Sequence, residues 1–216
     1  MKRTNTMTIS ETREKLLSDT AFVITELQKV QTLYELKRVI RYNHNRSEEQ
    51  HTESVAEHIF GMHCLVDYFL PLEDTEGEWD IARIRTMVQY HDSDEIITGD
   101  EIGYRKSAAD HANERNASEV VLAKLPTHLA ETVRQALDTY ESQTTPEAKF
   151  VKAIDKIEPV FHLYNETGKT TLAKLRTTKD EHDRIKYPAV EPFPVIRRFA
   201  QVMTEQFMRE GFYTEE

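Results

Sequence analysis

Apolar residues recur at helical spacing near the start of the chain. Between residues 8 and 34 they fall on one face of a helix, at Leu16, Val23, Leu27, Val30 and Tyr34. Thr8 and Glu11 precede this stripe with the spacing of a capping box. The pattern predicts a first helix across this segment.

A polar stretch then separates two further helical patterns. Residues 38–54 show no apolar period, hold three arginines and are expected to form a loop. A second stripe starts at Val55 and predicts a helix that ends at Pro71, with His58 at the edge of its apolar face. A third helix is expected from Ile81 through His91 and Glu95, ending near Gly99.

The rest of the chain is also helical in pattern. Helices are expected over residues 107–125, 128–142 and 146–166, the last of them broken or kinked near Pro159. "YPAVEPFP" is expected to be a proline-rich connector, and a final helix should run from Val195 to Arg209, with an apolar stripe that suits either the core or a dimer seam. The fold class is therefore all-α, and residues 1–216 are expected to form a single domain.

Charge and composition narrow the function. The formal net charge is -10, which disfavours a nucleic-acid polymer as a partner, although a small anionic substrate remains possible where a metal or an arginine reverses the field. The chain has no long apolar run, so we expect no membrane segment. One cysteine, Cys64, suits the reducing cytoplasm and is expected to be a small buried residue.

The segment "VQYHDSDEIITGD", residues 88–100, places His91 and Asp92 on the apolar side of the expected helix. An unpaired carboxylate is costly to bury there, and a divalent cation would neutralise it. Two other polar residues stand where the pattern favours apolar ones, His58 on the preceding helix and Asp155 between Ile154 and Ile157. Each also has an ordinary structural reading, as a satisfied core histidine or a solvated aspartate.

Histidine, a His-Asp pair and a later aspartate follow in the order of one known family. The chain resembles the HD-domain metal-dependent phosphohydrolases, and "ESVAEHIFGMHCL" with "YHDSDEIITGD" is similar to the branch of the bacterial 5'-deoxynucleotidases. The resemblance covers roughly residues 36–164 and implies an HD-domain helical bundle with one metal site in its core. It implies four metal ligands, His58, His91, Asp92 and Asp155.

Other roles come from the same resemblance. Glu95 and Asp100 match the acids that handle protons, and Arg41 matches the phosphate-binding arginine, with Arg38 as the alternative. Two departures leave the sugar and base preference open. Tyr42 stands where the branch commonly has tryptophan, and "GDEIGYRK" lacks the proline usually found after "TGD".

The implied activity is release of phosphate from nucleoside 5'-monophosphates, with a metal-activated water as the nucleophile. Two imidazoles and two carboxylates suit Mn, Co, Fe, Ni or Zn better than Mg. A triphosphate should need cations that the sequence does not cluster near the motif. The alternatives are hydrolysis of another phosphoester (a nucleoside triphosphate, a cyclic dinucleotide or an alarmone) and a noncatalytic module in which the metal only holds the core together.

Three further expectations follow. The resemblance favours a homodimer. His51 is a possible substrate contact. His63, His111 and His162 have no ligand-like spacing to the His-Asp pair and are expected to be structural.

Overall fold

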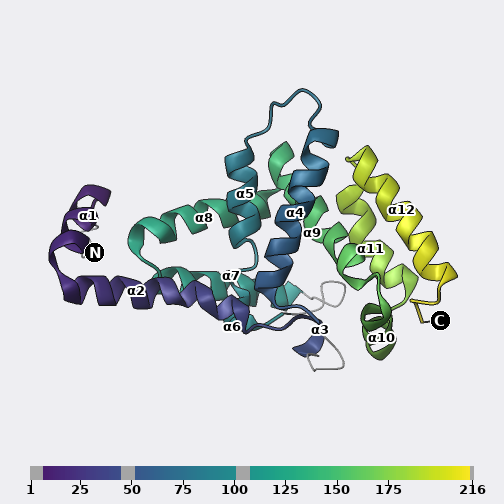
Figure 1. Ribbon diagram of the computed structural model, residues 1–216, viewed down its shortest axis with the longest axis horizontal. Helices are drawn as coiled ribbons and strands as arrows, with labels where there is room; N and C mark the ends of the chain where they lie inside the picture. Colours follow the sequence, from purple (N-terminus) through teal and green to yellow (C-terminus); the bar gives the residue numbers. More distant parts are fainter. Residues whose placement is uncertain (1–6, 45–51, 101–107, 215–216) are drawn as a thin grey trace.

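The computed structural model describes residues 7–44, 52–100 and 108–214, and within these ranges the secondary structure is helical apart from an isolated antiparallel bridge between Ile40 and Ser54. The expected all-α class is confirmed (Figure 1). The first elements along the chain are α1 (Ile9–Ser18), α2 (Thr20–Tyr34), η1 (Glu35–Lys37), α3 (Arg41–His44), α4 (Val55–Glu73), α5 (Ile81–Tyr90) and α6 (Glu95–Thr98). They are followed by α7 (Ala108–Lys124), α8 (Thr127–Ser142), α9 (Pro146–Leu163), α10 (Glu166–Leu175), α11 (Lys179–Val190) and α12 (Pro194–Arg209).

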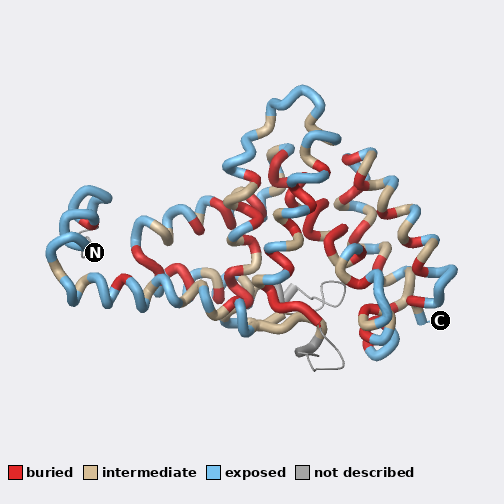
Figure 2. The backbone as a smooth tube through the Cα atoms, viewed as in Figure 1, coloured by how far each residue is buried: buried red, intermediate tan, exposed pale blue. Residues whose placement is uncertain are grey.

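Helix α9 lies at the centre of the molecule and packs against α4, α5, α8 and α11. Buried residues of α4, α5 and α9 belong to one hydrophobic core, and Figure 2 shows buried segments concentrated in the middle of the molecule. The fully buried residues there include Met62, Phe69, Ile84, Met87, Phe150, Ile154 and Ile157. This arrangement brings the C-terminal end of α5 against α4 and α9, which is where the sequence places its His-Asp pair.

The first expected helix is two helices. Asp19 ends α1 and begins α2, because its side chain accepts a hydrogen bond from the Phe22 amide while its own amide bonds to the Lys15 carbonyl. Together they form an arm: α1 and the first part of α2 extend beyond the other helices, and α2 then contacts α7 and η1 (Figure 1). The apolar stripe of this arm is exposed, at Leu16, Val23, Leu27, Val30 and Tyr34.

The expected helix from Ile81 to Gly99 is also interrupted. Helix α5 ends at Tyr90, residues 91–94 form a turn, and the short helix α6 follows. Aspartate and serine compete for backbone hydrogen bonds, so Asp92, Ser93 and Asp94 favour a turn over a continued helix. Gly99 ends α6 with a φ of 75°, as the sequence indicates for a helix end.

Two helices continue beyond a proline at which the sequence predicted an end or a break. Pro159 lies inside α9, which continues to Leu163, and Pro71 lies inside α4, which continues to Glu73. The expected connector is shorter than predicted: Pro188 is within α11, only residues 191–193 are non-helical, and Pro194 is the first residue of α12. A proline removes one helical hydrogen bond, but the burial of apolar side chains on these helices stabilises them by more than the lost bond costs.

The last helix and the cysteine resolve two open points. The buried face of α12 packs on the core through Ile196, Ala200, Thr204 and Phe207, so this stripe belongs to the core rather than to a dimer interface.

Cys64 is exposed, contrary to expectation, because it lies on the face of α4 opposite to Val66. In the described part of the chain, each helix is too short or too polar to cross a bilayer.

Candidate metal and phosphate site

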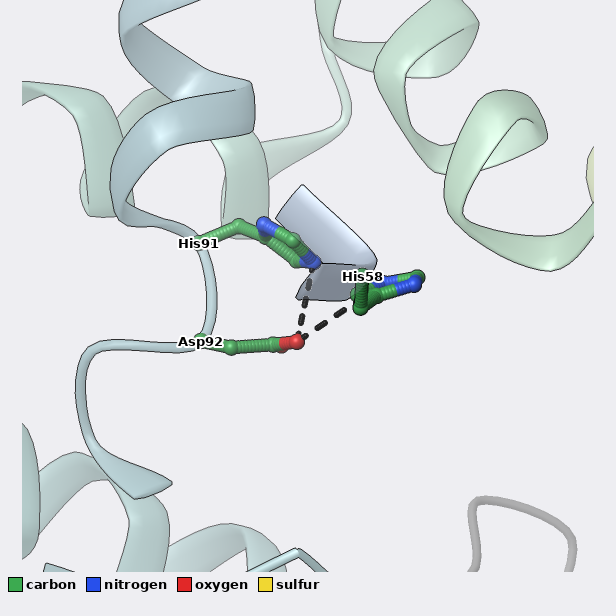
Figure 3. Close-up of side chains that lie close together, drawn as sticks. All are labelled: His58, His91 and Asp92. Carbon is green, nitrogen blue, oxygen red and sulfur yellow. Dashed lines mark ion pairs between the residues drawn. The ribbon is translucent and has the colours of Figure 1, made fainter. Parts of the chain in front are cut away.

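The structure brings two histidines and an aspartate together from separate elements. His58 comes from α4, and His91 and Asp92 come from the turn directly after α5; each offers an atom within 4.8 Å of the others. Asp92 Oδ2 lies 3.1 Å from His91 Nε2 and 3.9 Å from His58 Nε2. Figure 3 shows the Asp92 carboxylate pointing toward both imidazoles.

The opposite nitrogen of each ring fixes which nitrogen faces the centre. His91 Nδ1 lies 3.1 Å from the Val88 carbonyl oxygen, which can only accept, so Nδ1 carries the hydrogen. His58 Nδ1 lies 2.7 Å from Glu158 Oε2 and donates to it in the same way. In the neutral imidazoles, both Nε2 atoms therefore hold a lone pair directed toward Asp92. This is the arrangement of metal-binding histidines.

Asp155 approaches the same centre from α9. Its Oδ1 lies 3.5 Å from His58 Nε2, while its Oδ2 accepts from the Tyr140 hydroxyl at 2.8 Å and lies 2.8 Å from Lys156 Nζ. Burial opposes a charge on Asp155, but Lys156 and His58 outweigh it and hold the pKa of this carboxyl well below its ordinary value. Asp155 thus presents one oxygen to the centre, while Tyr140 and Lys156 hold the other.

The four expected ligands fit a divalent ion on their own chemistry. The Nε2 atoms of His58 and His91 are buried and make no hydrogen bond of normal geometry within the described part of the chain. Burial works against the charge on Asp92, yet His91 outweighs it and keeps the pKa of that carboxyl below its usual range. His58, His91 and Asp92 surround one point, and Asp155 lies at its edge, beside His58. With both imidazoles neutral, the four residues offer a mixed nitrogen and oxygen donor set.

Arg41 lies beside this centre and is surrounded by carboxylates. Its Nη1 is 2.7 Å from Glu53 Oε1 and 3.7 Å from Glu158 Oε2, and its Nε is 3.5 Å from Asp100 Oδ1. Burial, with a smaller contribution from Glu158, raises the pKa of Glu53 to about 7 despite the opposing effect of Arg41. One guanidinium thus faces three carboxyl groups, so this corner gains no net positive charge from Arg41.

Asp100 also holds the backbone next to Arg41. Tyr42 has a φ of 61°, a conformation that non-glycine residues rarely adopt, and its amide donates to Asp100 Oδ2 at 3.0 Å. The Tyr42 ring stacks on His162, with centroids 5.8 Å apart. His162 Nδ1 in turn lies 3.4 Å from Glu53 Oε2. Asp100 therefore grips both the side chain of Arg41 and the strained residue that follows it.

A cavity of about 490 Å³ opens over these groups. Glu95, which is 6% exposed, lines it together with Arg41, His91, Asp92, Asp100 and Asp155. Arg38 does not line this cavity; it is exposed and pairs with Glu35 at 2.8 Å, so the geometry favours Arg41 over this alternative.

The cavity wall is more basic than the sequence indicated. Besides Arg41 it includes Arg115, Lys152, Lys156 and Arg184. These residues are far apart in the chain, and only the packing of α7, α9 and α11 brings them to one cavity. Seven carboxylates line the same cavity, so these cations lie near the motif in space without making the wall positive overall.

Three partners of the site were missed by the sequence analysis: Glu53, Tyr140 and Glu158. Glu158 had a signal, because it follows Asp155 by three residues and shares its helix face. Gly61 was missed as well: a Cβ there would lie 2.6 Å from Glu158 Oε1, so glycine admits this carboxylate. His162 has contacts with Tyr42 and Glu53 that its spacing did not suggest. His51 and the side chain of His111 lie outside the described residues.

Comparisons with known proteins agree with this geometry. Over 136 residues the chain is 32% identical to a 5'-deoxynucleotidase HDDC2 of Xenopus laevis, spanning 62% of this chain and 65% of that protein. It is 30% identical over 119 residues to the 5'-deoxynucleotidase hdd1 of Schizosaccharomyces pombe, spanning 52% of this chain and 57% of that protein. The chain thus spans a little under two thirds of the length of these curated relatives.

A solved structure shares the fold. A predicted metal-dependent phosphohydrolase from Magnetospirillum magnetotacticum MS-1 superposes with a TM-score of 0.75 at 22% identity, covering 89% of this chain and 98% of that one. A family model described as an HD domain matches residues 33–195, further toward the C-terminus than the expected core of 36–164. With His58, His91 and Asp92 brought together where α4 meets the turn after α5, the chain belongs to the HD domain family.

Proposed function

We propose that this protein is a metal-dependent phosphohydrolase that releases phosphate from nucleoside 5'-monophosphates. The observation that carries the proposal is the pair of buried Nε2 atoms of His58 and His91, facing Asp92 beside a cavity that also holds an arginine. The relatives named 5'-deoxynucleotidases support the monophosphate as the substrate class.

His58, His91, Asp92 and Asp155 would hold one divalent ion, with Mn, Co, Fe, Ni or Zn preferred over Mg for a site with two imidazoles. When bound, such an ion supplies Lewis-acid chemistry, since it polarises a phosphoryl oxygen and lowers the pKa of a coordinated water. Tyr140 and Lys156 keep one oxygen of Asp155 turned away from the centre, which favours a ligand that offers a single oxygen.

The remaining groups act on the substrate and its protons. Arg41 donates to the phosphate from the cavity wall, and Glu53, Asp100 and Glu158 fix its direction. Glu95 faces the cavity and acts as a general base for the attacking water, and Asp100 is the second carboxyl group that handles protons in the reaction. The apolar part of the wall, which includes Leu137, Leu172 and Ile185, would enclose the nucleoside and keep out bulk water.

A second candidate substrate class has a specific observation in its favour. Lys152, Lys156 and Arg184 line the same cavity as Arg41, and such cations could meet the outer phosphates of a nucleoside triphosphate. Lys156 already pairs with Asp155, and Lys152 already donates to Tyr140, which favours the monophosphate.

We further propose that the enzyme is a cytoplasmic homodimer with no nucleic-acid polymer as partner.

One screen tests the proposal. The protein is reconstituted with Mn or Co and incubated with ribo- and deoxynucleoside monophosphates, triphosphates and cyclic dinucleotides, and phosphate and pyrophosphate are measured. We expect phosphate from 5'-monophosphates, little from 3'-monophosphates, and loss of activity with chelator. His91→Ala, purified in parallel, should bind less metal and be inactive. If triphosphates are cleaved while monophosphates stay intact, the substrate class is nucleoside triphosphates and the monophosphate proposal fails. If the protein binds metal but cleaves none of the compounds, a noncatalytic module is favoured.

A matched pair of variants tests the arginine. Arg41→Ala should lower kcat/KM for the monophosphate by about 30-fold or more, since a charge-assisted contact to phosphate is worth about 2 kcal/mol or more, and should leave metal content unchanged. Arg38→Ala removes an arginine that is exposed and outside the cavity, so it should retain the parental rate. Equal losses in both variants would contradict the assignment of Arg41.

A further inference from the structure

His162 is a partly buried histidine beside the candidate site, and the proposed mechanism gives it no role. It lies in the last turn of α9, about two helical turns after Asp155, and its side chain is 24% exposed. It is not among the residues that line the cavity, whereas Tyr42, which it contacts, does line it. The imidazole can therefore act on the site only through the side chains that it contacts.

The first of these contacts is a stack with Tyr42. The two rings are nearly parallel, with 9° between their planes and 5.8 Å between their centroids, which is the geometry of an offset stack. Tyr42 has the unfavourable φ of 61°, and such a residue keeps its conformation only when its surroundings hold it. The guanidinium carbon of Arg41 lies 5.4 Å from the centroid of the same ring. His162 thus supports a ring that Arg41 also contacts.

The second contact is with Glu53, a carboxylate that is 4% exposed. Its Oε2 lies 3.4 Å from His162 Nδ1. Its Oε1 lies 2.7 Å from Arg41 Nη1 and accepts from the Tyr42 hydroxyl at 3.4 Å. A buried carboxylate needs polar partners on both oxygens, and His162 is the partner of Oε2. Burial lowers the pKa of His162, so the imidazole is neutral at neutral pH and adds no second positive charge beside Arg41.

We propose that His162 is a positioning residue, which holds Tyr42 and Glu53 in place and so directs Arg41 toward the substrate phosphate. The inference rests on the proposed function, in which Arg41 is the phosphate contact. Glu53 is the nearest of the three carboxylates that Arg41 faces, at 2.7 Å, and the other two lie 3.5 Å and 3.7 Å from guanidinium nitrogens. If Glu53 moves, the guanidinium turns with it or toward the other two, and its alignment with a phosphate is lost.

The end of α9 does not depend on the imidazole. The His162 carbonyl accepts a hydrogen bond from Asn165 Nδ2 at 2.7 Å, and the Asn165 side chain caps the next helix, α10. These contacts use the backbone of residue 162, so a substitution there keeps them. Removing the ring should alter the contacts with Tyr42 and Glu53 and leave both helices in place.

A double-mutant cycle tests the inference in the metal-loaded, full-length protein. His162→Ala should lower kcat/KM for adenosine or deoxyadenosine 5'-monophosphate by about 10-fold, mostly through KM, because a misdirected Arg41 weakens phosphate binding. In an Arg41→Ala background the same substitution should have almost no effect, since the arginine that His162 directs is gone. His128→Ala, at an exposed position outside the cavity, is the control and should keep the parental constants.

Three kinetic outcomes overturn the inference. His162→Ala could leave kcat/KM unchanged, or it could lower kcat/KM equally in both backgrounds. It could also lower kcat while KM stays parental, which is the sign of a general structural role.

Two conservative variants separate the contacts. His162→Phe keeps the stack on Tyr42 without Nδ1, and His162→Asn keeps a donor near Glu53 without the ring. Each should recover part of the rise in KM that His162→Ala causes. A KM that stays as high in both variants as in His162→Ala contradicts positioning through these contacts.

Binding of inorganic phosphate separates this inference from the proposed function. In isothermal titration of the Co-loaded protein, the dissociation constant for phosphate should rise by about 10-fold in His162→Ala and stay parental in His128→Ala. If the parent leaves monophosphates intact but the variants show this pattern, the proposed substrate class fails and the role of His162 stands. If the parent and His162→Ala bind phosphate equally, or the parent binds none, the inference fails whatever the substrate is.

Discussion

His58 and Glu158 lie 100 residues apart in the chain, and their side chains meet with 2.7 Å between Nδ1 and Oε2. Burial lowers the pKa of an imidazole, but Glu158 and Asp155 outweigh burial and raise the pKa of His58 to about 9. The metal-free site thus attracts positive charge strongly. Glu158, which is not one of the four expected ligands, thus fixes the orientation of His58, which is.

Glu158→Ala should weaken metal binding. Without the carboxylate, His58 loses the acceptor that holds its ring and raises its basicity, and loss of such a partner commonly costs about 10-fold to 100-fold in affinity. Equilibrium dialysis against buffered Co or Zn measures the change. Glu158→Gln keeps an acceptor oxygen and should lose less. Parental affinity in Glu158→Ala would show that the contact does not support the ligand.

Gly61→Ala tests the same contact from the other side. Replacing glycine by alanine inside a helix normally stabilises a protein by about 1 kcal/mol. Here the added Cβ would lie 2.6 Å from Glu158 Oε1, so the carboxylate must move away from its present place. We expect no gain in the free energy of unfolding and a lower metal affinity. A more stable variant with unchanged metal binding would contradict this account.

Tyr140→Phe should also lower metal affinity, by about 10-fold, because Asp155 loses the 2.8 Å hydrogen bond that anchors its outer oxygen. Lys152 Nζ, which lies 2.9 Å from the same hydroxyl, loses a partner too. Tyr68→Phe is the control, since Tyr68 is 53% exposed on α4. Isothermal titration with metal compares the three proteins, and equal affinities would remove Tyr140 from the site.

Glu95→Ala and Asp100→Ala should keep the metal and lose turnover by roughly two to four orders of magnitude, the usual weight of acid-base groups. Asp100→Ala should in addition raise KM, because Asp100 holds both Arg41 and the Tyr42 amide. Metal content, kcat and KM are measured on the same preparations. A variant that loses metal in proportion to its rate would make that residue a ligand.

Acid should destabilise the protein through His182. Burial, with Lys186 nearby, lowers the pKa of His182 to about 3, whereas an unfolded histidine has a pKa of about 6.5. The folded pKa is the lower one, so the unfolded chain binds more protons as pH falls. Stability should then drop by up to about 1.4 kcal/mol per pH unit between about 6.5 and 3.

His182→Leu should remove this slope. The variant also loses the 2.8 Å hydrogen bond between His182 Nδ1 and the Tyr213 hydroxyl, which lowers stability by a nearly constant amount at all pH values. Urea unfolding of metal-free parent and variant, measured from pH 7 to 4, gives the difference between the two curves. A difference that does not vary with pH would rule out His182 as the source.

The sequence by itself determined the helical class, and it singled out the His-Asp pair as the candidate metal site. Apolar periodicity recovers most helices because one face of each must be buried. His58, His91, Asp92 and Asp155 stand out since each is polar where the period favours an apolar residue. Caps such as Thr8 and Glu11 are local and can be read directly.

Tertiary structure decided what depends on contacts between distant segments. Glu158 lies near Arg41 only because α9 packs against α4 and the segment before it, and no local pattern encodes that contact. Glu53 reaches Arg41 beside the antiparallel bridge between Ile40 and Ser54. The cations that line the cavity besides Arg41 come from α7, α9 and α11, so they lie together in space and not in sequence. Pro159 stays inside α9 because burial of that helix outweighs a missing hydrogen bond. Periodicity likewise showed that the arm has an apolar face, and only the fold revealed that the chain leaves it exposed.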